Sequence, residues 1–191
     1  MRDYITRELL ETQKIIDIML KDEAILNTIE NVITKSLECF KSNGKILFAG
    51  NGGSAADAQH MAGEFVSRFA FDRPGLPSIA LTTDTSIITA IGNDYGYDKI
   101  FERQIQALGR QGDIFVGYST SGKSLNIINA FKQAKTQNIT CVAMVGNLGG
   151  EIVDLCDYVI AVPSACTPKI QECHLMIGHI LCGLIEQKLF K

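Results

Sequence analysis

Two segments of the chain place a turn of small residues between a short apolar run and a helical pattern. The first turn reads Gly-Asn-Gly-Gly-Ser over 50–54, and the second reads Ser-Thr-Ser-Gly-Lys-Ser over 119–124. The apolar runs before them, 46–49 and 114–116, are typical of buried strands. A turn between a strand and a helix offers free backbone N–H groups and a helix N-terminus to an anion. Two such turns in one small chain indicate a site for a phosphate and the polyol attached to it.

From residue 45 onward, strand and helix patterns alternate. Strands are expected near 45–49, 78–81, 113–117, 139–145 and 158–162, and helices near 54–69, 84–92, 99–107, 124–137 and 168–190. This alternation predicts an α/β fold, a three-layer αβα sandwich with a five-stranded parallel sheet. Ligands of such folds bind at the carboxyl ends of the strands, where both small-residue turns fall.

Two amphipathic helices, over 3–21 and 22–43, are expected ahead of this core. In the second helix apolar residues recur at a spacing of three to four, and Gly44 provides a stop. The whole chain, 1–191, is expected to form one domain, with a helical pair over 1–43 and an α/β core over 44–191. The pair carries more apolar surface than the core alone needs, which favours contact with partner subunits; packing onto its own domain is an equal alternative.

Composition narrows the classes of function. The 191 residues carry a net charge of −3 with interspersed signs, which gives no basic face for nucleic acid. No apolar run approaches ~20 residues, so no membrane span is expected, and the first residues lack the apolar core of a signal peptide. The six cysteines include no Cys-x-x-Cys pair and mostly lie in apolar patterns, which favours free thiols in a reducing compartment. A soluble cytosolic protein is expected.

The helix expected over 54–69 has a polar arc. Asp57, His60, Glu64 and Arg68 fall within about 80° of one another at 100° per residue. An ordinary solvated face, with His60 and Glu64 as a chance i,i+4 pair, is one interpretation. Because the helix begins at the first turn, the same arc also overlooks the anion site, and His60 and Glu64 at this spacing can share a metal ion.

The terminal helix carries polar residues within an otherwise apolar pattern, and these need partners. Glu172 and His179 align within about 20° on a helical wheel, whereas Gln171 and His179 differ by about 80°. Wheel geometry therefore favours pairing Glu172 with His179, and Gln171 is the alternative. His174 lies about 140° from His179, which indicates a structural or surface role.

The segments described so far resemble the sugar isomerase (SIS) family, and within it the phosphoheptose isomerases. The resemblance covers almost the whole chain and rests on motifs in order. They are the first turn with Ala-Ala-Asp-Ala-Gln-His after it, Gly-Asn-Asp-Tyr-Gly at 92–96, the Ser-Thr-Ser-Gly turn, Gln-Glu at 171–172, and Ile-Gly-His-Ile-Leu at 177–181.

The resemblance implies the SIS fold and roles for individual residues. It implies that one Zn²⁺ ion per subunit is held by His60, Glu64, Gln171 and His179, and that Glu64 and His179 are also the catalytic acid/base pair. It implies substrate contacts at Asn51, Gly52, Gly53, Ser54, His60, Glu64, Asn93, Asp94, Ser119, Thr120, Ser121, Ser124 and Gln171. Of Gln171 and Glu172, the family pattern selects Gln171.

The resemblance also implies the reaction and the assembly. The expected protein is a cytosolic aldose–ketose isomerase that converts sedoheptulose 7-phosphate to D-glycero-D-manno-heptose 7-phosphate. This is the first step toward ADP- or GDP-heptose precursors of bacterial surface glycans such as lipopolysaccharide or capsule. Family members are homotetramers with sites between subunits, so the expected partners are copies of this chain and a sugar phosphate. The reaction needs a base beside a carbonyl and an acid or cation at the enediolate oxygen, which a Glu and a His facing one polyol provide.

Two other classes of function compete. Residues 117–124 match the nucleotide-binding phosphate loop G-x-x-x-x-G-K-S, including Lys123. However, no apolar strand run ends in a convincing magnesium-binding aspartate, and Asp84 is the nearest. A catalytically silent SIS-type binding protein, of the kind that associates with the replication initiator, is the other class. Such relatives lack a carboxylate at the position of Glu64, so its presence favours an enzyme.

Overall fold

The computed structural model describes residues 1–147 and 149–191. Over these residues five strands form one sheet in the order β2–β1–β3–β4–β5, and every neighbouring pair is parallel. The strands are β1 (Ile46–Ala49), β2 (Ser78–Ala80), β3 (Ile114–Ser119), β4 (Thr140–Gly146) and β5 (Tyr158–Val162). The predicted α/β fold with a five-stranded parallel sheet is therefore confirmed.

The order of the strands places both small-residue turns at one point of the sheet. The chain passes from β1 outward to β2 and then crosses back to β3, so β1 and β3 lie side by side, with Ala49 paired to Gly117. Neighbouring parallel strands whose connections leave in opposite directions form the crevice in which such sheets bind ligands. The turn after β1 and the turn after β3 both open into this crevice.

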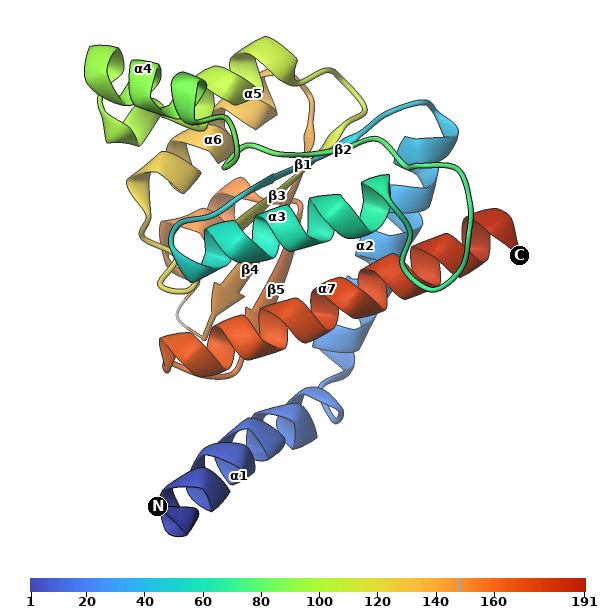
Figure 1. The fold of residues 1–191 in the computed structure, drawn as a ribbon, viewed down its shortest axis with the longest axis vertical. Helices are drawn as coiled ribbons and strands as arrows, with labels where there is room; N and C mark the ends of the chain where they lie inside the picture. Colours follow the sequence, from blue (N-terminus) through green and yellow to red (C-terminus); the bar gives the residue numbers. More distant parts are fainter. Residues whose placement is uncertain (148) are drawn as a thin grey trace.

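Helices cover both faces of the sheet (Figure 1). They are α1 (Arg2–Met19), α2 (Glu23–Lys41), α3 (Gly53–Val66), α4 (Thr85–Tyr95), α5 (Glu102–Leu108), α6 (Leu125–Thr136) and α7 (Thr167–Phe190), with short 3₁₀ turns η1 (Tyr97–Lys99) and η2 (Gly150–Leu155). Side chains alternate along each strand: Ile46 and Phe48 pack in a cluster with α2, α3 and α7, whereas Leu47 and Ala49 pack with α5 and α6. Two apolar layers thus hold the three-layer sandwich together.

The two N-terminal helices are present, but they pack differently. Helix α2 buries a full apolar stripe, including Ile25, Ile29 and Phe40, in the cluster beneath the sheet. Helix α1 buries only Ile15 and Met19 and projects from the body of the molecule (Figure 1). Its exposed apolar side chains are Tyr4, Ile5, Leu9, Leu10 and Ile18. Helix α2 is therefore part of the core of its own chain, whereas α1 leaves an apolar face exposed that another molecule could contact.

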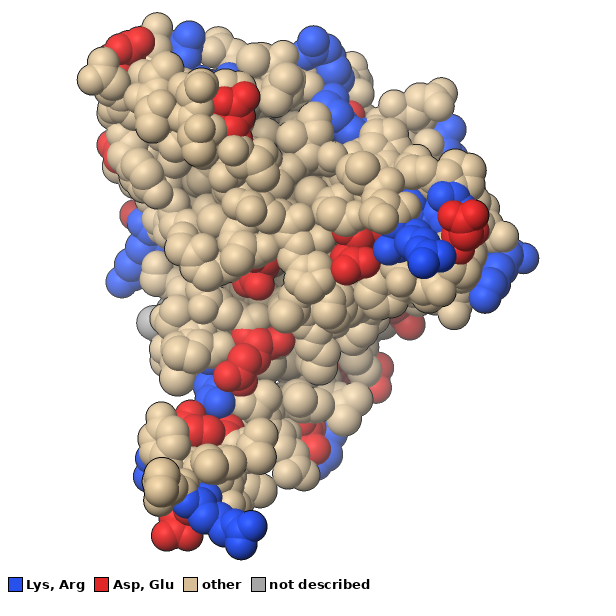
Figure 2. Space-filling view, viewed as in Figure 1, with Lys and Arg blue, Asp and Glu red and all other residues tan. Residues whose placement is uncertain are grey.

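The charged surface is mixed. Figure 2 shows basic and acidic side chains interspersed on the face in view, separated by uncharged surface. Within the part of the chain that the structure describes, no helix has both the length and the apolar character that crossing a membrane requires.

The third helix is shorter than the sequence predicts. The expected helix extends to residue 69, but α3 ends at Val66, so Arg68 and Phe69 lie beyond it. The chain turns back here because the N–H of Leu76 donates to the carbonyl of Phe65 and the Arg73 guanidinium donates to the carbonyls of Glu64 and Phe65. Arg68 therefore does not belong to the helical polar arc.

His174 has a structural place, as one of the two roles predicted for it. Its side chain is fully buried on α7, and its Nε2 donates to the carbonyl of Val145, 3.2 Å away. Burial lowers the pKa of His174 to about 4. The folded chain thus binds a proton here more weakly than the unfolded chain, whose histidine pKa is near the ordinary 6.5. This contribution to stability is present above the unfolded pKa and is lost as the pH falls toward the folded pKa.

We therefore expect His174→Gln to lose less stability on acidification than the wild type, because glutamine keeps a donor for Val145 and does not titrate. Between about pH 7 and about pH 4.5 the fall in the free energy of unfolding should be smaller by about 2–3 kcal/mol. Urea unfolding followed by circular dichroism, with chelator present so that metal release does not contribute, measures both falls. Equal falls would show that His174 is not the titrating group.

Candidate active site

A cavity of about 270 Å³ lies where the two small-residue turns meet. It is lined by Asn51, Gly52, Gly53, Ser54, Tyr118, Ser119, Thr120, Ser124, Thr167 and Gln171. Except for Tyr118 and Thr167, all of these were predicted from the sequence as substrate contacts. The N-termini of α3 and α6 adjoin the cavity, so backbone N–H groups and helix dipoles favour an anion there.

The glycines of the turns are required by close contacts. Gly122 has a φ of +66°, and a Cβ at this position would overlap the carbonyl oxygen of Gly149. A Cβ at Gly53 would lie 2.8 Å from Nε2 of Gln171, at the end of a flexible side chain, so a larger residue here would push that amide away from the first turn. Gly122 thus lets the second turn approach the backbone at Gly149, and Gly53 gives the Gln171 amide room beside the first turn.

A hydrogen-bond network holds Asn51 at the mouth of the first turn. The amides of Asn51 and Asn126 bond reciprocally at 3.0 and 2.8 Å, and the hydroxyl of Tyr97 donates to Oδ1 of Asn51 at 2.9 Å. Asn126 and Tyr97 were not predicted from the sequence. Asn126 is only 3% exposed although it is polar, and its place on the arc of α6 that also holds Ala130 and Ala134, both buried, is the one signal that could have identified it.

Across the cavity the hydroxyls of Ser119 and Ser124 are hydrogen-bonded to each other, with 3.0 Å between the oxygens. Ser119 ends β3, and Ser124 precedes the first residue of α6. The predicted contact Ser121 is exposed and lies outside the residues that line the cavity; its hydroxyl accepts from the N–H of Lys123 at 3.2 Å. Ser119 and Ser124 are therefore the hydroxyls best placed for an anion.

A second group of side chains lies along the same two helices. His60 and Glu64 on α3 meet His179 on α7, and one ligand atom from each lies within 4.8 Å of the others. His60 Nε2 lies 3.1 Å from Glu64 Oε1 and 3.3 Å from His179 Nε2. Two ring nitrogens and a carboxylate oxygen that converge in this way form a donor set that suits a divalent metal such as Zn²⁺, with room for further ligands.

The structure separates Gln171 from Glu172. The Gln171 amide donates to the Ser54 hydroxyl at 3.3 Å and lines the cavity. The Glu172 carboxylate points away, toward α1, where it accepts from the hydroxyl of Thr12 at 2.6 Å and lies 3.3 Å from Nζ of Lys169. Wheel alignment with His179 was therefore a wrong guide to the position of Glu172, because α1, and not α3, covers its side of α7.

The comparisons with known proteins agree with this geometry. The family model described as the SIS domain matches residues 12–146. A phosphoheptose isomerase of Burkholderia pseudomallei is 62% identical over 187 residues, which are 98% of this chain and 95% of that protein. The chain belongs to the phosphoheptose isomerase family. Another relative of that name, from Aneurinibacillus thermoaerophilus, is 57% identical over 100% of this chain and 96% of its own length.

Solved structures of this family share the fold over its full length. The phosphoheptose isomerase of Neisseria gonorrhoeae superposes with a TM-score of 0.91 at 39% identity, covering 97% of this chain and 98% of that chain. The enzyme of Francisella tularensis gives a TM-score of 0.92 at 35% identity, with 97% of each chain covered. The expected SIS fold is thus confirmed for this phosphoheptose isomerase family member.

The phosphate-loop alternative finds no support in this family member. Lys123 is exposed and does not line the cavity, whereas a nucleotide-binding loop directs this lysine at the phosphates. Asp84, the nearest match to a magnesium-binding aspartate, caps α4 by accepting from the N–H of Ile87 at 2.9 Å. Neither residue is therefore placed as a nucleotide site would place it.

Two predicted substrate contacts lie apart from the cavity in this chain. Asn93 and Asp94 are on α4, where the Asn93 amide donates to the Asp94 carboxylate at 2.9 Å. Among the described residues no side chain of α4 is fully buried, although Ile88 and Ile91 pack against the apolar cluster with α5 and α6, and the helix stands at the edge of the molecule in Figure 1. Among the residues that the structure describes, none from α4 lines the cavity. Their assignment as substrate contacts therefore stays a prediction.

Asp57, the remaining member of the predicted polar arc, is set deeper in α3. One oxygen of its carboxylate is buried without a hydrogen-bond partner among the described residues, and burial raises the pKa of Asp57 to about 6. It precedes His60 by nearly one helical turn and lies outside the His60–Glu64–His179 group. The arc predicted from the wheel is thus divided: His60 and Glu64 join His179, and Asp57 does not belong to that group.

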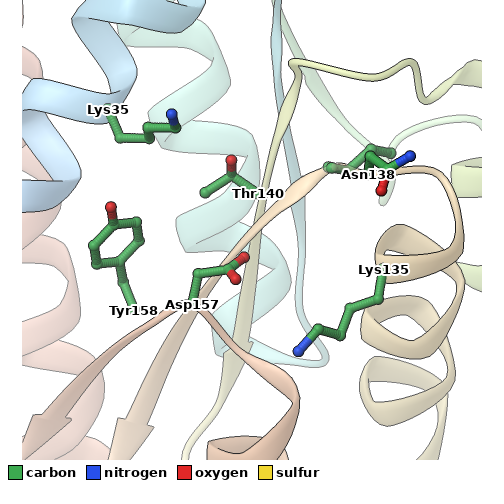
Figure 3. A pocket seen from close by; sticks show the side chains of 7 residues that line it. Lys35, Lys135, Asn138, Thr140, Asp157 and Tyr158 are labelled. Atoms are coloured by element: carbon green, nitrogen blue, oxygen red, sulfur yellow. The ribbon is translucent and has the colours of Figure 1, made fainter.

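A larger hollow, of about 360 Å³, lies at the amino ends of β4 and β5, opposite the end of the sheet that carries the candidate site. In Figure 3, Lys35 and Lys135 lie on either side of Asp157, with Thr140 and Tyr158 nearby. The Asp157 carboxylate accepts from the N–H of Cys141 at 2.7 Å, which fixes the start of β4. Since parallel sheets bind ligands at the carboxyl ends of their strands, this hollow does not belong to the candidate site.

Proposed function

We propose that this chain is the isomerase that interconverts sedoheptulose 7-phosphate and D-glycero-D-manno-heptose 7-phosphate. The single observation that carries the proposal is the approach of Glu64 and His179, from two helices, beside a cavity built for a phosphate. The full-length relatives named phosphoheptose isomerase support it. A nucleotide-binding protein or a silent binding module would leave the carboxylate and imidazole pair without a use.

In this proposal the two small-residue turns hold the substrate. The hydroxyls of Ser119, Thr120, Ser121 and Ser124, with the N-terminus of α6, bind the phosphate. Asn51, Gly52, Gly53, Ser54 and Gln171 bind the polyol from the opposite wall, and the Asn126 and Tyr97 bonds keep the Asn51 amide in one orientation. Asn93 and Asp94 would complete the site if α4 approaches when the sugar binds.

Glu64 and His179 carry the proton transfers. One of the pair removes a proton from C1 of the ketose while O2 gains a proton, which gives an enediol. A proton then returns to C2 as O1 loses its own proton, so the aldose has the same atoms as the ketose. A positioned acid or base of this kind contributes about 10²–10⁴-fold to the rate. Because both groups face one volume, a single planar enediol can meet them in turn.

The donor set at this point fits Zn²⁺. His60, Glu64 and His179 would hold it, with the Gln171 amide oxygen as a fourth ligand once that side chain leaves Ser54. Two unprotonated ring nitrogens 3.3 Å apart repel each other, so a cation between them or a proton on one of them is required. When bound, a zinc ion polarises a substrate oxygen and stabilises its developing negative charge.

We further propose a cytoplasmic homotetramer with sites near the subunit interfaces. The exposed apolar side chains of α1 are the surface for subunit contact, since contiguous exposed apolar patches mark interaction sites. The heptose phosphate product would supply ADP- or GDP-heptose synthesis for surface glycans.

One assay tests the reaction. Purified protein incubated with sedoheptulose 7-phosphate should give the aldose signals of the heptose 7-phosphate in a proton spectrum, and solvent deuterium should enter at C2. A ketose phosphate that stays unchanged, with or without added Zn²⁺, would overturn the proposed activity.

The hydroxyls of Ser119 and Ser124, which we propose bind the phosphate, give a quantitative prediction. A hydrogen bond to a charged group contributes about 1.5–3 kcal/mol, so Ser119→Ala or Ser124→Ala should raise KM by roughly ten- to hundredfold. Lys123→Ala is the matched control on the same turn and should change KM much less. Steady-state kinetics with the heptose phosphate measures all three. A large loss in Lys123→Ala, together with Mg²⁺-dependent ATP binding by the wild type, would favour the nucleotide alternative.

A further inference from the structure

Glu186 is a buried carboxylate that the proposed reaction does not use. It lies on α7, seven residues beyond His179, and is completely inaccessible to solvent. A buried charge is costly unless hydrogen bonds or an opposite charge compensate it. Its oxygens accept from three consecutive backbone N–H groups, those of Phe69, Ala70 and Phe71, at 3.0–3.2 Å. The carboxylate therefore anchors the segment that follows α3 onto α7.

Arg73 completes the arrangement from the other side. Its side chain is 2% exposed, and its Nε lies 3.9 Å from Oε1 of Glu186. The two terminal nitrogens donate to four carbonyls at the end of α3 and just after it: those of Glu64, Phe65, Ser67 and Pro74, at 2.6–3.2 Å. Burial alone would raise the pKa of Glu186, but the backbone donors and Arg73 outweigh it and lower that pKa. The pair is therefore charged in the folded chain.

This pair, which we call the Glu186–Arg73 clamp, contacts both halves of the candidate active site. Arg73 Nη2 donates to the carbonyl of Glu64 itself, at 2.9 Å. The ring of Phe69, whose N–H Glu186 accepts, lies 5.5 Å from the ring of His179, centre to centre. A Cβ at Gly183 would lie 3.1 Å from the same phenyl ring, so one side of the ring packs directly against α7 at this glycine.

We propose that Glu186 and Arg73 are positioning residues that fix the separation of α3 and α7 and so bring His60, Glu64 and His179 together. The inference rests on the proposed function for its kinetic consequence, but its metal-binding consequence is independent of any substrate. Without the clamp, the end of α3 is free to shift relative to α7. Three ligand atoms that must meet within a few ångströms tolerate little such movement.

The test compares Glu186→Gln with a matched control at the amino ends of the strands, opposite the candidate site. Asp113 is also a buried carboxylate that accepts backbone N–H groups, those of Lys45 and Arg110, and pairs with a lysine. Asp113→Asn should therefore cost similar stability while leaving the site alone. Thermal unfolding of both variants measures this shared structural cost.

Co²⁺ titration of the metal-free proteins, followed by visible absorption, gives the deciding measurement. We expect Glu186→Gln to bind Co²⁺ roughly tenfold more weakly and with a changed spectrum, since disturbed support of metal ligands typically costs 10–100-fold in affinity. Its kcat should fall by a similar factor while KM stays within about threefold. Asp113→Asn should match the wild type in Co²⁺ affinity, kcat and KM.

Equal stability losses with unchanged Co²⁺ affinity in Glu186→Gln would overturn the inference and leave the clamp a purely structural pair. A wild type that binds no Co²⁺ would overturn it too. If Glu186→Gln does not fold, Arg73→Lys provides the same comparison, because it keeps the charge but cannot reach all four carbonyls. A wild type that binds Co²⁺ without isomerising sedoheptulose 7-phosphate refutes the proposed function alone, and Co²⁺ affinity still tests the clamp.

Discussion

Glu64→Gln is expected to lower kcat for sedoheptulose 7-phosphate by roughly 10²–10⁴-fold, with the fold and the assembly unchanged. Glutamine has the shape of glutamate but can neither remove nor return a proton. The Glu64 side chain is 25% exposed, so the change buries no new unpaired group in the core. Initial rates, circular dichroism and size-exclusion chromatography measure the three parts of this expectation.

Glu172→Gln is the matched control for this experiment. Glu172 is the carboxylate that the helical wheel aligned with His179, yet it contacts Thr12 and Lys169. Its replacement should leave kcat near that of the wild type. Near-normal activity in Glu64→Gln would make Glu64 an ordinary surface residue, and a loss confined to Glu172→Gln would restore the wheel argument.

The inner strands β1 and β3 could be predicted from the sequence because they are buried on both faces. The runs at 46–49 and 114–119 are buried at every residue, so they are continuously apolar or small and easily recognised. The end of α3 could not be predicted, since Arg73 lies seven residues and Glu186 lies 120 residues beyond Val66, and the two are on different segments. Contacts of this kind exist only after the chain has folded.

The residues of the candidate site also differ in how well the sequence predicts them. The turns at 50–54 and 119–124 carry a local signal, because small residues between a strand and a helix have few other uses. His60 and Glu64 carry a weaker signal, since a solvated face has the same periodicity. Asn126 and Tyr97 were missed because a single polar side chain has no period. Glu172 was misplaced because a wheel gives the angle between two residues but not which helix lies opposite each of them.

Removal of the metal is expected to abolish turnover. Prolonged chelation should inactivate the protein, and added Zn²⁺ should restore it. The ligand atoms of His60, Glu64 and His179 lie within 4.8 Å of one another. Removal of the ion therefore leaves two imidazoles and a carboxylate without a cation to share. Metal analysis beside initial rates measures the expectation. A metal-free protein with full activity would contradict it and leave Glu64 and His179 as a metal-free acid/base pair.

The same experiment decides whether Gln171 is a metal ligand. In the present conformation the Gln171 amide donates to the Ser54 hydroxyl. Gln171 precedes His179 by eight residues, which is about 12 Å along the axis of α7. Long side chains from both ends can still meet between these positions, so Gln171→Ala should weaken Zn²⁺ retention during dialysis against chelator. His60→Ala, which removes a ligand of the convergent group, sets the scale for a full loss. If Gln171→Ala keeps its zinc as firmly as the wild type but raises KM, Gln171 binds the sugar and the ion rests on His60, Glu64 and His179 alone.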